Sequence, residues 1–237
     1  MHRTSCQFHW FNEGFSNFSH YLEKFTSRKR KNIKKERLKL RESGFIFHRK
    51  VADQITPADI KNFYHCYQLT YAKRNMQGYL TLEFFLTVLA TMPDQLVLVQ
   101  AQYESHDSNT NLSIPKTVAN ALYFKDGDNL YGRYWGCLEE FDSLHFECCY
   151  YQGIEYCIEN DISHFDPGTQ GEHKISRGFE PTICHSQHWI AHPEFSDAIQ
   201  NFLKEEQFDI DDYALQASQH LPFNQSSKSP LQSSQKS

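Results

Sequence analysis

The stretch from His164 to Trp189 reads HFDPGTQGEHKISRGFEPTICHSQHW, and its residue types decide what we expect of the rest of the chain. Proline fixes φ, and glycine readily adopts the positive φ that other residues avoid. Pro167, Gly168 and Gly171 therefore predict tight turns. Turns of this kind bring backbone N–H groups close to a ligand, so the stretch is typical of a binding or catalytic site.

Titratable side chains follow these turns directly. His173 can accept a proton, Lys174 offers a point charge, and Arg177 offers a planar fork that can hold a carboxylate or phosphate through two hydrogen bonds. The alternative is an ordinary surface loop with solvated charges, because clustered titratable groups mark sites only in some cases. The loop supplies two catalytic candidates, Glu172 and His173, and four substrate-binding candidates, Gln170, Gly171, Lys174 and Arg177.

A helix is predicted immediately before this stretch, over residues 144–162. Glu147, Tyr151 and Glu155 recur at i, i+4 and i+8, and so share one helix face. If that face meets the glycine-containing loop, Glu147 lies near Lys174 or Arg177. Glu147 is accordingly a third catalytic candidate and Tyr151 a further substrate-binding candidate, with a simple ion pair as the alternative. Another stripe of this helix is apolar and consists of Phe146, Cys149, Tyr150, Gly153, Ile154 and Cys157.

The run Lys174–Phe179, KISRGF, looks like the FKRGF-like run that follows the last long helix in GNAT-fold proteins of the Fem type. Other short motifs resemble a bacterial family of GNAT-like proteins of peptidoglycan biosynthesis or recognition, and the similarity extends from about Cys6 to Leu203. This resemblance implies an α+β, GNAT-like (acyl-CoA N-acyltransferase) fold, with a twisted mixed sheet flanked by helices. The motifs are LHFE at 144–147, CYYQGIE at 149–155, GEHK at 171–174, RG at 177–178 and HWI at 188–190.

The resemblance also implies an activity, which is transfer of an acyl or aminoacyl group to an amine of a small molecule or a muropeptide-like peptidoglycan precursor. It implies acyl-CoA or aminoacyl-tRNA as the donor, and tRNA or an acidic carrier as a partner. The glycine-rich pyrophosphate loop of ordinary GNAT enzymes is replaced here by the acidic residues 137–143, CLEEFDS. Acidic side chains repel phosphate, so the replacement favours an aminoacyl-tRNA or a carrier-bound donor.

Two other classes of function stay open. The chain could be a non-catalytic binding module that recognises a peptide-like or glycan ligand through Tyr131, Arg133 and Trp135, which alternate onto one face of a predicted strand. Arg133 and Trp135 therefore join the substrate-binding candidates. The chain could also be a shortened half of a larger protein, because members of the family are generally longer at the amino-terminal end.

Composition narrows the class of protein. The chain of 237 residues is 39% hydrophobic, which is enough to bury a substantial core. No apolar run approaches about 18 residues and no leader peptide precedes a cleavage site, so we expect neither a membrane span nor a signal peptide, and a cytoplasmic location. Seven cysteines without CxxC spacing argue against a disulfide framework and a zinc site, so no metal is expected.

The net charge of −5 is unevenly distributed. Residues 27–41 contain nine Lys or Arg and one Glu, and the rest of the chain carries 15 basic and 28 acidic residues. We predict a basic helix over 27–41 that ends before Gly44. Its charges form either a solvated helix face or a platform for the phosphates of RNA or nucleotides, or for an acidic carrier. The anion-binding candidates are Arg28, Lys29, Arg30, Lys31, Lys34 and Lys35.

Local signals predict several further elements. Thr56–Asp59, reading TPAD, is typical of a capped helix start with proline at the first helical position. A second helix opens at Thr81. The sequence DGDN at 126–129 lies between two strand-like runs and predicts a hairpin. The inward positions predicted for the second helix are Phe85, Val88, Leu89 and Met92.

We predict a single domain over residues 1–218, with a loose surface loop at the polar insertion 104–115. A final helix starts at Pro193. Residues 219–237 are rich in Ser and Gln and contain too few apolar residues to fold, so they are predicted to be disordered. The inward positions predicted for the final helix are Phe195, Ala198, Ile199 and Phe202.

Overall fold

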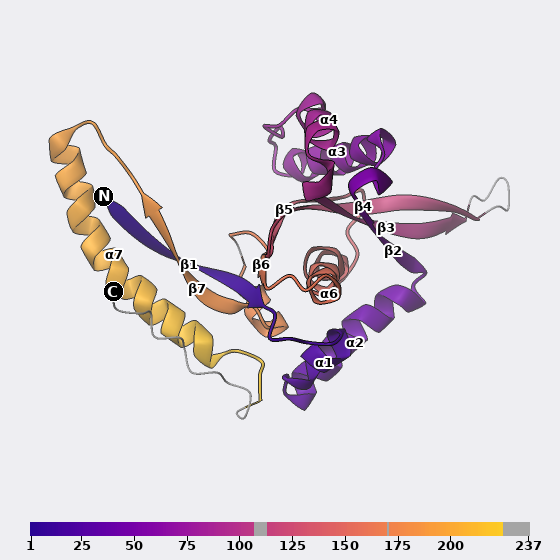
Figure 1. Cartoon of the computed structure of the whole chain (residues 1–237), viewed down its shortest axis with the longest axis horizontal. Helices are drawn as coiled ribbons and strands as arrows, with labels where there is room; N and C mark the ends of the chain where they lie inside the picture. Colours follow the sequence, from indigo (N-terminus) through magenta and orange to yellow (C-terminus); the bar gives the residue numbers. More distant parts are fainter. Residues whose placement is uncertain (107–112, 170, 225–237) are drawn as a thin grey trace. The chain divides into compact units, whose positions relative to one another are not determined.

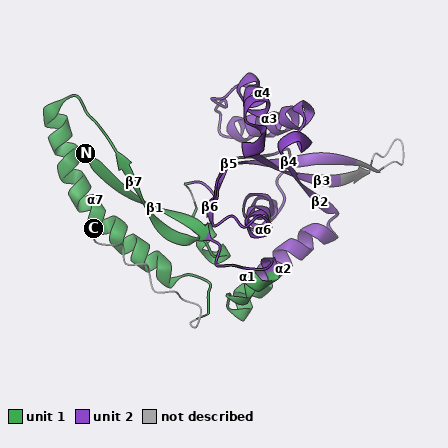
Figure 2. Cartoon of the chain, in the orientation of Figure 1, with its two compact units in different colours: residues 1–10, 19–31, 169–237 green, residues 11–18, 32–168 purple. Residues whose placement is uncertain are grey.

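The structure is a computed structural model, and it describes residues 1–106, 113–169 and 171–224 (Figure 1). The chain divides into two compact units, which Figure 2 shows in green and purple. Unit 1 comprises residues 1–10, 19–31 and 169–237, and unit 2 comprises residues 11–18 and 32–168. The single domain expected over 1–218 stays a prediction.

Unit 2 is built on a sheet with the strand order β2-β3-β4-β5-β6. The first four strands are antiparallel to their neighbours, whereas β6 pairs with β5 in parallel, so the sheet is mixed, as expected for an α+β fold. The parallel ladder covers only Asn129–Tyr131 of β5 and His164–Asp166 of β6. The strands are β2 (Phe45–Val51), β3 (Leu96–His106), β4 (Ser113–Asp126), β5 (Asn129–Cys137) and β6 (His164–Asp166).

Two hairpins connect the central strands of this sheet. β4 and β5 meet at the predicted hairpin, where Gly127 has a φ of 51°. β3 and β4 continue further than predicted, because Glu104 pairs with Pro115 and His106 pairs with Ser113. The loose loop predicted over 104–115 is therefore wrong at both ends, since polar residues continue the ladder there. Its central part, 107–112, lies outside the described residues.

The helices α3 (Pro57–Ala72) and α4 (Leu82–Thr91) pack on the sheet of unit 2 (Figure 1). The predicted cap of α3 is confirmed, since the Thr56 side chain accepts a hydrogen bond from the Asp59 N–H, and the Asp59 carboxylate accepts one from the Thr56 N–H at 2.9 Å. A cap of this kind contributes about 1 kcal/mol. The buried core that results contains Ile55, Ile60, Phe63, Tyr67, Phe85, Leu96, Leu98 and Leu122.

The inward positions of α4 are confirmed only in part. Phe85 is buried, and Val88 and Leu89 pack against the core. Met92 is exposed, because α4 ends at Thr91 and Met92 already has a non-helical φ of −139°.

The end of α3 is fixed directly to β5. A Cβ at Gly136 would clash with the backbone carbonyl of Cys66, so the strand can approach the helix this closely only with glycine. The hydroxyl of Thr70 donates to the carbonyl oxygen of Trp135 at 3.0 Å. The last turn of α3 and the end of β5 therefore form one rigid junction.

The predicted helix over 144–162 is interrupted by a π-helical turn. It consists of α5 (Leu144–Phe146), the π turn Glu147–Tyr151 and α6 (Gln152–Glu159). A π turn inserts a residue and rotates the side chains that follow. The predicted apolar stripe is confirmed at Tyr150, Gly153, Ile154 and Cys157, which are buried, and is confirmed only in part at Phe146 and Cys149, which are half-buried.

Unit 1 consists of a two-stranded ribbon with a long helix along it. β1 (His2–Phe11) and β7 (Glu180–Gln187) are antiparallel, with His2 opposite Gln187 and His9 opposite Glu180. α7 (Pro193–Gln219) contacts β1 through the Arg3–Glu206 ion pair at 2.6 Å. The unit also contains most of α1 (Phe18–Glu23) and the first turn of α2 (Ser27–Glu42), which is the predicted basic helix.

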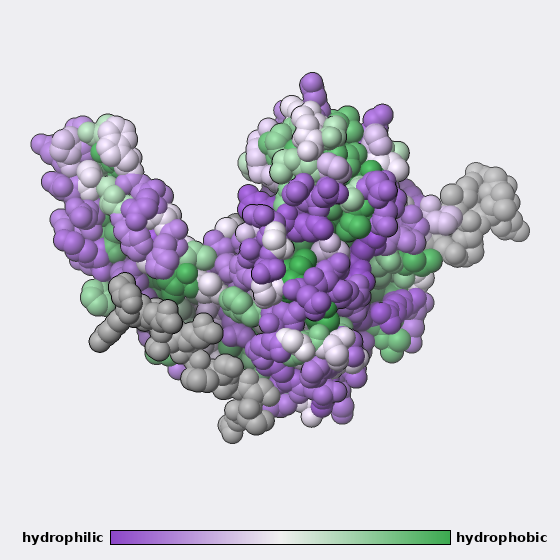
Figure 3. Space-filling view, viewed as in Figure 1, coloured by the Kyte–Doolittle hydropathy of each residue, from purple (hydrophilic) through white to green (hydrophobic). Residues whose placement is uncertain are grey.

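The face that α7 turns inward is not the predicted one. Phe195, Ala198 and Phe202 are exposed, and Ile199 is half-buried. The contacts with β1 come instead from later residues, including Tyr213, whose ring lies 6.3 Å from that of Phe8. On the side visible in Figure 3, α7 presents mainly hydrophilic residues. In the described part of the chain, no helix, α7 included, is long and apolar enough to cross a membrane.

Disorder was expected from residue 219 onward, and this is wrong for residues 219–224. α7 continues to Gln219, and Phe223 is buried with its ring 5.3 Å from that of Phe25. These residues are held by an antiparallel bridge between Phe25 and Phe223 and by backbone hydrogen bonds, from the Thr26 N–H to the Pro222 carbonyl at 2.8 Å and from the Asn224 N–H to the Lys24 carbonyl at 2.7 Å. The rest of the predicted tail, 225–237, lies outside the described residues.

Candidate functional site

The turns predicted at Gly168 and Gly171 are confirmed, since these residues have φ values of 94° and 109°, and Gly178 also has a positive φ, of 85°. Between the last two glycines, Glu172–Arg177 form a 3-10 turn in unit 1. The Tyr21 hydroxyl of α1 donates to the Arg177 carbonyl oxygen at 2.8 Å, and a Cβ on Gly178 would clash with that hydroxyl. The turn is therefore held in one conformation by α1.

Two cationic side chains of this turn are buried. Lys174 is 1% exposed and Arg177 is 7% exposed. Buried lysine and arginine side chains are rare in proteins unless they are paired. Nη1 of Arg177 donates to the carbonyl oxygen of His173 at 2.9 Å, and the backbone N–H of Lys174 donates to the carbonyl oxygen of Gly171 at 3.1 Å. The turn therefore places two buried positive charges three positions apart in the chain.

His173 and Glu172 have different environments within the same turn. Burial lowers the pKa of His173 below its ordinary 6.5, and the positive charges of Arg177 and Lys174 lower it further. The imidazole is therefore neutral at pH 7 and can accept a proton. The carboxylate of Glu172 accepts a hydrogen bond from the hydroxyl of Tyr213 at 2.9 Å, and burial together with this hydrogen bond raises the pKa of Tyr213 to about 12.

A second cluster of charges lies in unit 2 and centres on Arg37 of α2. Its Nε and Nη2 donate to the two carboxylate oxygens of Glu147 at 2.9 and 2.8 Å, and its Nη1 donates to Glu155 at 2.7 Å. The side chains of Arg37 and Glu147 are only 9% and 2% exposed. Burial lowers the pKa of Arg37, but the hydrogen bond to Glu155 and the charge of Glu147 outweigh burial and raise it. Arg37 therefore stays charged.

The π turn sets the geometry around this buried pair. Gln152, five positions after Glu147, donates to the same carboxylate at 2.7 Å. The guanidinium of Arg37 lies 4.5 Å over the ring of Phe18, and the hydroxyl of Tyr151 donates to Glu36 at 2.5 Å. Glu147 is thus held as the partner of Arg37. Its predicted proximity to the cations of the glycine-containing turn, which belongs to unit 1, stays a prediction.

Sequence reasoning missed Arg37, although a signal for it was present. Ile33, Arg37 and Leu40 recur at i, i+4 and i+7 and are the buried residues of α2. This stripe was missed because every cation of the basic run was assigned to a single exposed helix face. Of the anion-binding candidates, Arg28, Lys31, Lys34 and Lys35 are exposed, and Lys29 and Arg30 are half-buried.

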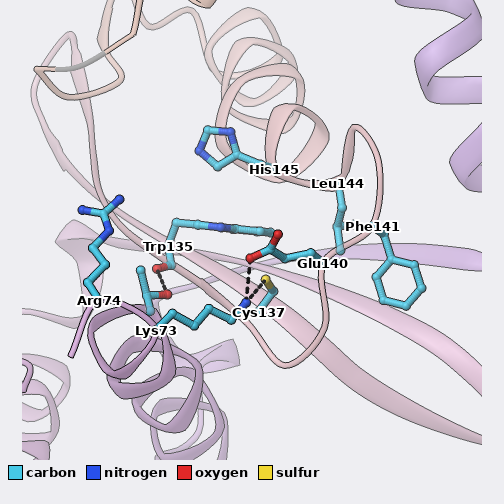
Figure 4. A pocket seen from close by; sticks show the side chains of 9 residues that line it. Lys73, Arg74, Trp135, Cys137, Glu140, Phe141, Leu144 and His145 are labelled. Carbon is cyan, nitrogen blue, oxygen red and sulfur yellow. Dashed lines mark hydrogen bonds and ion pairs between the residues drawn. The ribbon is translucent and has the colours of Figure 1, made fainter. Parts of the chain in front are cut away.

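Unit 2 contains a pocket of about 400 Å³ at the carboxyl-terminal end of β5 (Figure 4). Its walls come from the last turn of α3, the end of β5, the loop that follows and the start of α5. The pocket lies beyond the short parallel ladder between β5 and β6, which ends at Tyr131. The lining residues are Thr70, Lys73, Arg74, Trp135, Cys137, Glu140, Phe141, Leu144 and His145.

Ion pairs neutralise much of the loop 137–143. Lys73 Nζ lies 2.9 Å from Glu140 and 3.9 Å from the sulfur of Cys137 (Figure 4), and Lys39 Nζ lies 2.7 Å from Asp142. The hydrogen bond to Glu140 raises the pKa of Lys73, and burial opposes that rise only in part. The repulsion of phosphate that the sequence predicts for this loop is therefore weaker than its composition indicates.

The sequence candidates fall into separate parts of the chain. Glu172, His173, Lys174 and Arg177 share one turn of unit 1, with Gly171 at its start, and Gln170 lies outside the described residues. Glu147, Tyr151, Arg133 and Trp135 belong to unit 2, where Trp135 lines the pocket and Arg133 is exposed. The described residues include no group of three or more His, Cys, Asp or Glu that could hold a metal ion.

Comparisons with known proteins support the resemblance seen in the motifs. The structure of FemX matches with a TM-score of 0.51 and 13% identity over 70% of this chain and 53% of that chain. This match shows that the chain has the GNAT-like fold. The structure of L-PGS from Bacillus licheniformis matches with a TM-score of 0.47 and 10% identity over 71% and 48% of the two chains. The chain thus spans about half the length of each. A comparison with curated proteins gives no match.

A family model covers nearly the whole chain. The FemAB-like model, described as peptidoglycan biosynthesis/recognition, matches residues 1–225. That range includes the turn of unit 1, the buried pair of Arg37 and Glu147, and the pocket. The chain belongs to the FemAB-like family of peptidoglycan biosynthesis or recognition proteins.

Proposed function

We propose that the chain is a Fem-type acyl- or aminoacyltransferase that modifies an amine of a peptidoglycan precursor in the cytoplasm. Membership of the FemAB-like family and the GNAT-like fold support this proposal. The observation that carries it is the 3-10 turn of unit 1, where a neutral His173 adjoins the buried side chains of Lys174 and Arg177.

The proposed reaction needs an uncharged amine as nucleophile. His173 takes a proton from the amine, and the amine nitrogen then forms a bond to the acyl carbon of the donor. The bond from that carbon to the oxygen or sulfur of the donor breaks, and the leaving group takes up the proton. Lys174 and Arg177 hold an anionic part of donor or acceptor, so that positioning and electrostatic stabilisation supply most of the rate.

Local contacts favour His173 over the two other catalytic candidates. Glu172 accepts a hydrogen bond from Tyr213, which suits a role in orienting the turn. Both carboxylate oxygens of Glu147 accept hydrogen bonds from Arg37, which suits a positioning role for the helical segment that contains it. Gly171 and Gln170 remain candidates for contacts with substrate through the backbone and an amide side chain.

The first experiment identifies the ligands. Ligands that bind the native state raise the melting temperature in proportion to occupancy, so the full chain is screened by thermal shift against acetyl-CoA, aminoacyl-tRNA and muropeptides. Turnover is then measured with the donor and acceptor that bind. Replacing His173 by Gln should lower kcat/KM by about 10²- to 10⁴-fold with the fold retained. Unchanged turnover in His173→Gln would remove His173 as the base.

The pH dependence provides an independent check. Because the pKa of His173 is lowered, the imidazole stays neutral to lower pH than an ordinary histidine. The acidic limb of the kcat/KM profile should therefore have its midpoint below 6.5, the ordinary histidine value. Replacing Arg177 by Gln removes one of the charges that lower the pKa, so this variant should shift the limb toward higher pH. A limb that does not move on this substitution contradicts the assignment.

The exposed face of α2 favours a second candidate function, which is binding of a polyanion such as tRNA without catalysis. Lys31, Lys34, Lys35 and Arg41 are exposed, and none of them forms an ion pair with another described residue. Cations of like sign at i, i+4 destabilise a helix by a few tenths of a kcal/mol each, and a bound polyanion relieves this cost. Phosphate contacts of this type release counterions, so the affinity should fall steeply with salt.

The two functions are separated by measuring tRNA affinity at several salt concentrations. Neutralising Lys29, Lys31, Lys34 and Lys35 together should weaken binding and flatten its salt dependence. The matched control replaces the exposed residues Lys61 and Lys204, which lie on other helices, by glutamine. Equal affinities in the two variants would dismiss α2 as a phosphate-binding surface.

A further inference from the structure

A pair of histidines lies on the ribbon of unit 1, where β1 and β7 run side by side (Figure 1). His2 of β1 is opposite Gln187 of β7, and Thr4 is opposite His185, so the two histidines are diagonal neighbours on one face of the ribbon. Nε2 of His2 lies 3.1 Å from Nδ1 of His185, and both residues are exposed. Their rings are stacked, with centroids 5.0 Å apart and an interplanar angle of 27°. Two ring nitrogens therefore meet at the surface of the ribbon.

The separation of these two nitrogens matches that of two ligands on one metal ion. An imidazole nitrogen lies about 2.0 to 2.1 Å from a zinc ion that it binds, so two nitrogens 3.1 Å apart would subtend an angle of about 100° at the ion. This angle lies between about 90° for octahedral and about 109° for tetrahedral coordination. The χ2 torsion of histidine is broad, so small rotations of these exposed rings can direct both lone pairs at the ion. The pair is therefore close to the geometry of a chelate.

The pair also lies where a link between the two strands would have the largest effect. His2 and Gln187 form the outermost pair of the β1–β7 ladder. No short turn joins the two strands, because His2 and His185 are 183 positions apart in the chain. A two-stranded ribbon is marginally stable at best by itself, and a metal link that closes a long loop restricts the unfolded chain. A bound ion would therefore stabilise this end of unit 1.

We propose that His2 and His185 together bind one divalent transition-metal ion of the zinc class, which links β1 to β7. Neutral imidazole suits Zn²⁺, Cu²⁺ and Ni²⁺, whereas Mg²⁺ and Ca²⁺ prefer oxygen ligands. Because the described residues hold no cluster of three or more His, Cys, Asp or Glu, water completes the coordination. Motif spacing did not predict this site, since the two ligands meet only through pairing of the strands. The inference does not depend on the proposed function.

The test is isothermal titration calorimetry of the full chain, without a histidine tag, with zinc chloride. Replacing either His2 or His185 by Gln should weaken zinc binding about 10²-fold, because the second nitrogen then no longer binds the ion intramolecularly. Both side chains are exposed, so neither substitution should disturb the fold. The matched control is His48→Gln, which removes an exposed histidine of β2 that is hydrogen-bonded to Gln102 and should leave the affinity unchanged. No binding at millimolar zinc overturns the proposal.

A second measurement identifies the ligands directly. On addition of zinc, NMR should show shifts in the ring signals of His2 and His185 before those of the other histidines among the 13 in the chain. Seven free cysteines could bind zinc instead, and in that case both histidine variants would keep the affinity of the wild type. A site formed by His2 and the amino group of Met1 would survive His185→Gln. Either outcome overturns the proposal.

Discussion

Two ion pairs in unit 2 each join a basic and an acidic side chain, but one pair is buried and the other is exposed. Arg37 and Glu147 are joined by two hydrogen bonds, and their side chains are 9% and 2% exposed. Lys73 and Glu140 are joined by a single contact of 2.9 Å at the mouth of the pocket, and are 42% and 80% exposed. Each pair connects residues 137–159 to a helix much earlier in the chain. Arg37 lies on α2, and Lys73 lies at the end of α3.

The difference in burial decides what each pair can do. The charges of a buried pair cannot return to water without unfolding part of the unit, so Arg37 and Glu147 suit a fixed structural role. An exposed pair exchanges readily with water and ions, so Lys73 remains available to a ligand. Charged residues in an exposed ion pair, which breaks easily, are therefore better candidates for ligand binding than charged residues in a buried pair with better hydrogen-bond geometry.

The largest expected effect comes from breaking the buried pair. Arg37→Met leaves Glu147 charged and buried, and should lower the free energy of unfolding by about 3 to 5 kcal/mol. Denaturant unfolding followed by circular dichroism measures it. Arg41→Met is the matched control, because Arg41 is an exposed cation of the same helix and its loss should cost less than about 0.5 kcal/mol. Similar losses of unfolding free energy in the two variants would mean that the buried pair stabilises the fold no more than an exposed cation does.

A double variant tests whether the loss arises from the stranded charge. Arg37→Met combined with Glu147→Leu removes both partners and replaces them with apolar groups, which is often neutral for a buried pair. The double variant should therefore be more stable than Arg37→Met alone. An additive loss would show that the packing of Arg37 against Phe18, at 4.5 Å, matters more than its charge.

The same contrast explains how much the sequence could predict. The cap at Thr56, the hairpin at Gly127 and the turn at Gly171 are confirmed, because each depends on residues close together in the chain. The Arg37–Glu147 pair joins residues 110 positions apart, and no local pattern specifies such a partner. The π turn added a second difficulty, because it shifts the helix periodicity on which the stripe after Ser143 was predicted.

The residues of the candidate site could be predicted where they lie close together in the chain, and not where distant segments meet. The residues of the turn Glu172–Arg177 were found from glycine and charge spacing alone, and their roles stay a prediction. Of the pocket, the sequence pointed to Trp135, to the acidic loop 137–143 and, through the motif LHFE, to Leu144 and His145. Lys73 and Arg74 follow a helix whose tyrosines and phenylalanines dominate the pattern, so the cations at its end carried no signal of their own.

An intermediate effect is expected at the junction that supports the exposed pair. Gly136→Ala forces a methyl group against the carbonyl of Cys66, and such overpacking usually costs about 1 to 3 kcal/mol. Gly132→Ala is the control on the same strand, because its added Cβ would lie 3.2 Å from Pro167 and the neighbour has to move much less. Denaturant unfolding should show the larger loss at Gly136. If the order is reversed, the pocket walls are less rigid than the contact indicates.

The smallest effect is expected at the exposed pair itself. Lys73→Met should change the free energy of unfolding by less than about 1 kcal/mol, and Lys39→Met should do the same. Adding salt screens exposed charges, so the difference between wild type and Lys73→Met should shrink further at high ionic strength. A loss at Lys73 as large as that at Arg37 would erase the distinction between the two pairs. A small change in the free energy of unfolding at Lys73 would instead show that the fold does not depend on this exposed pair.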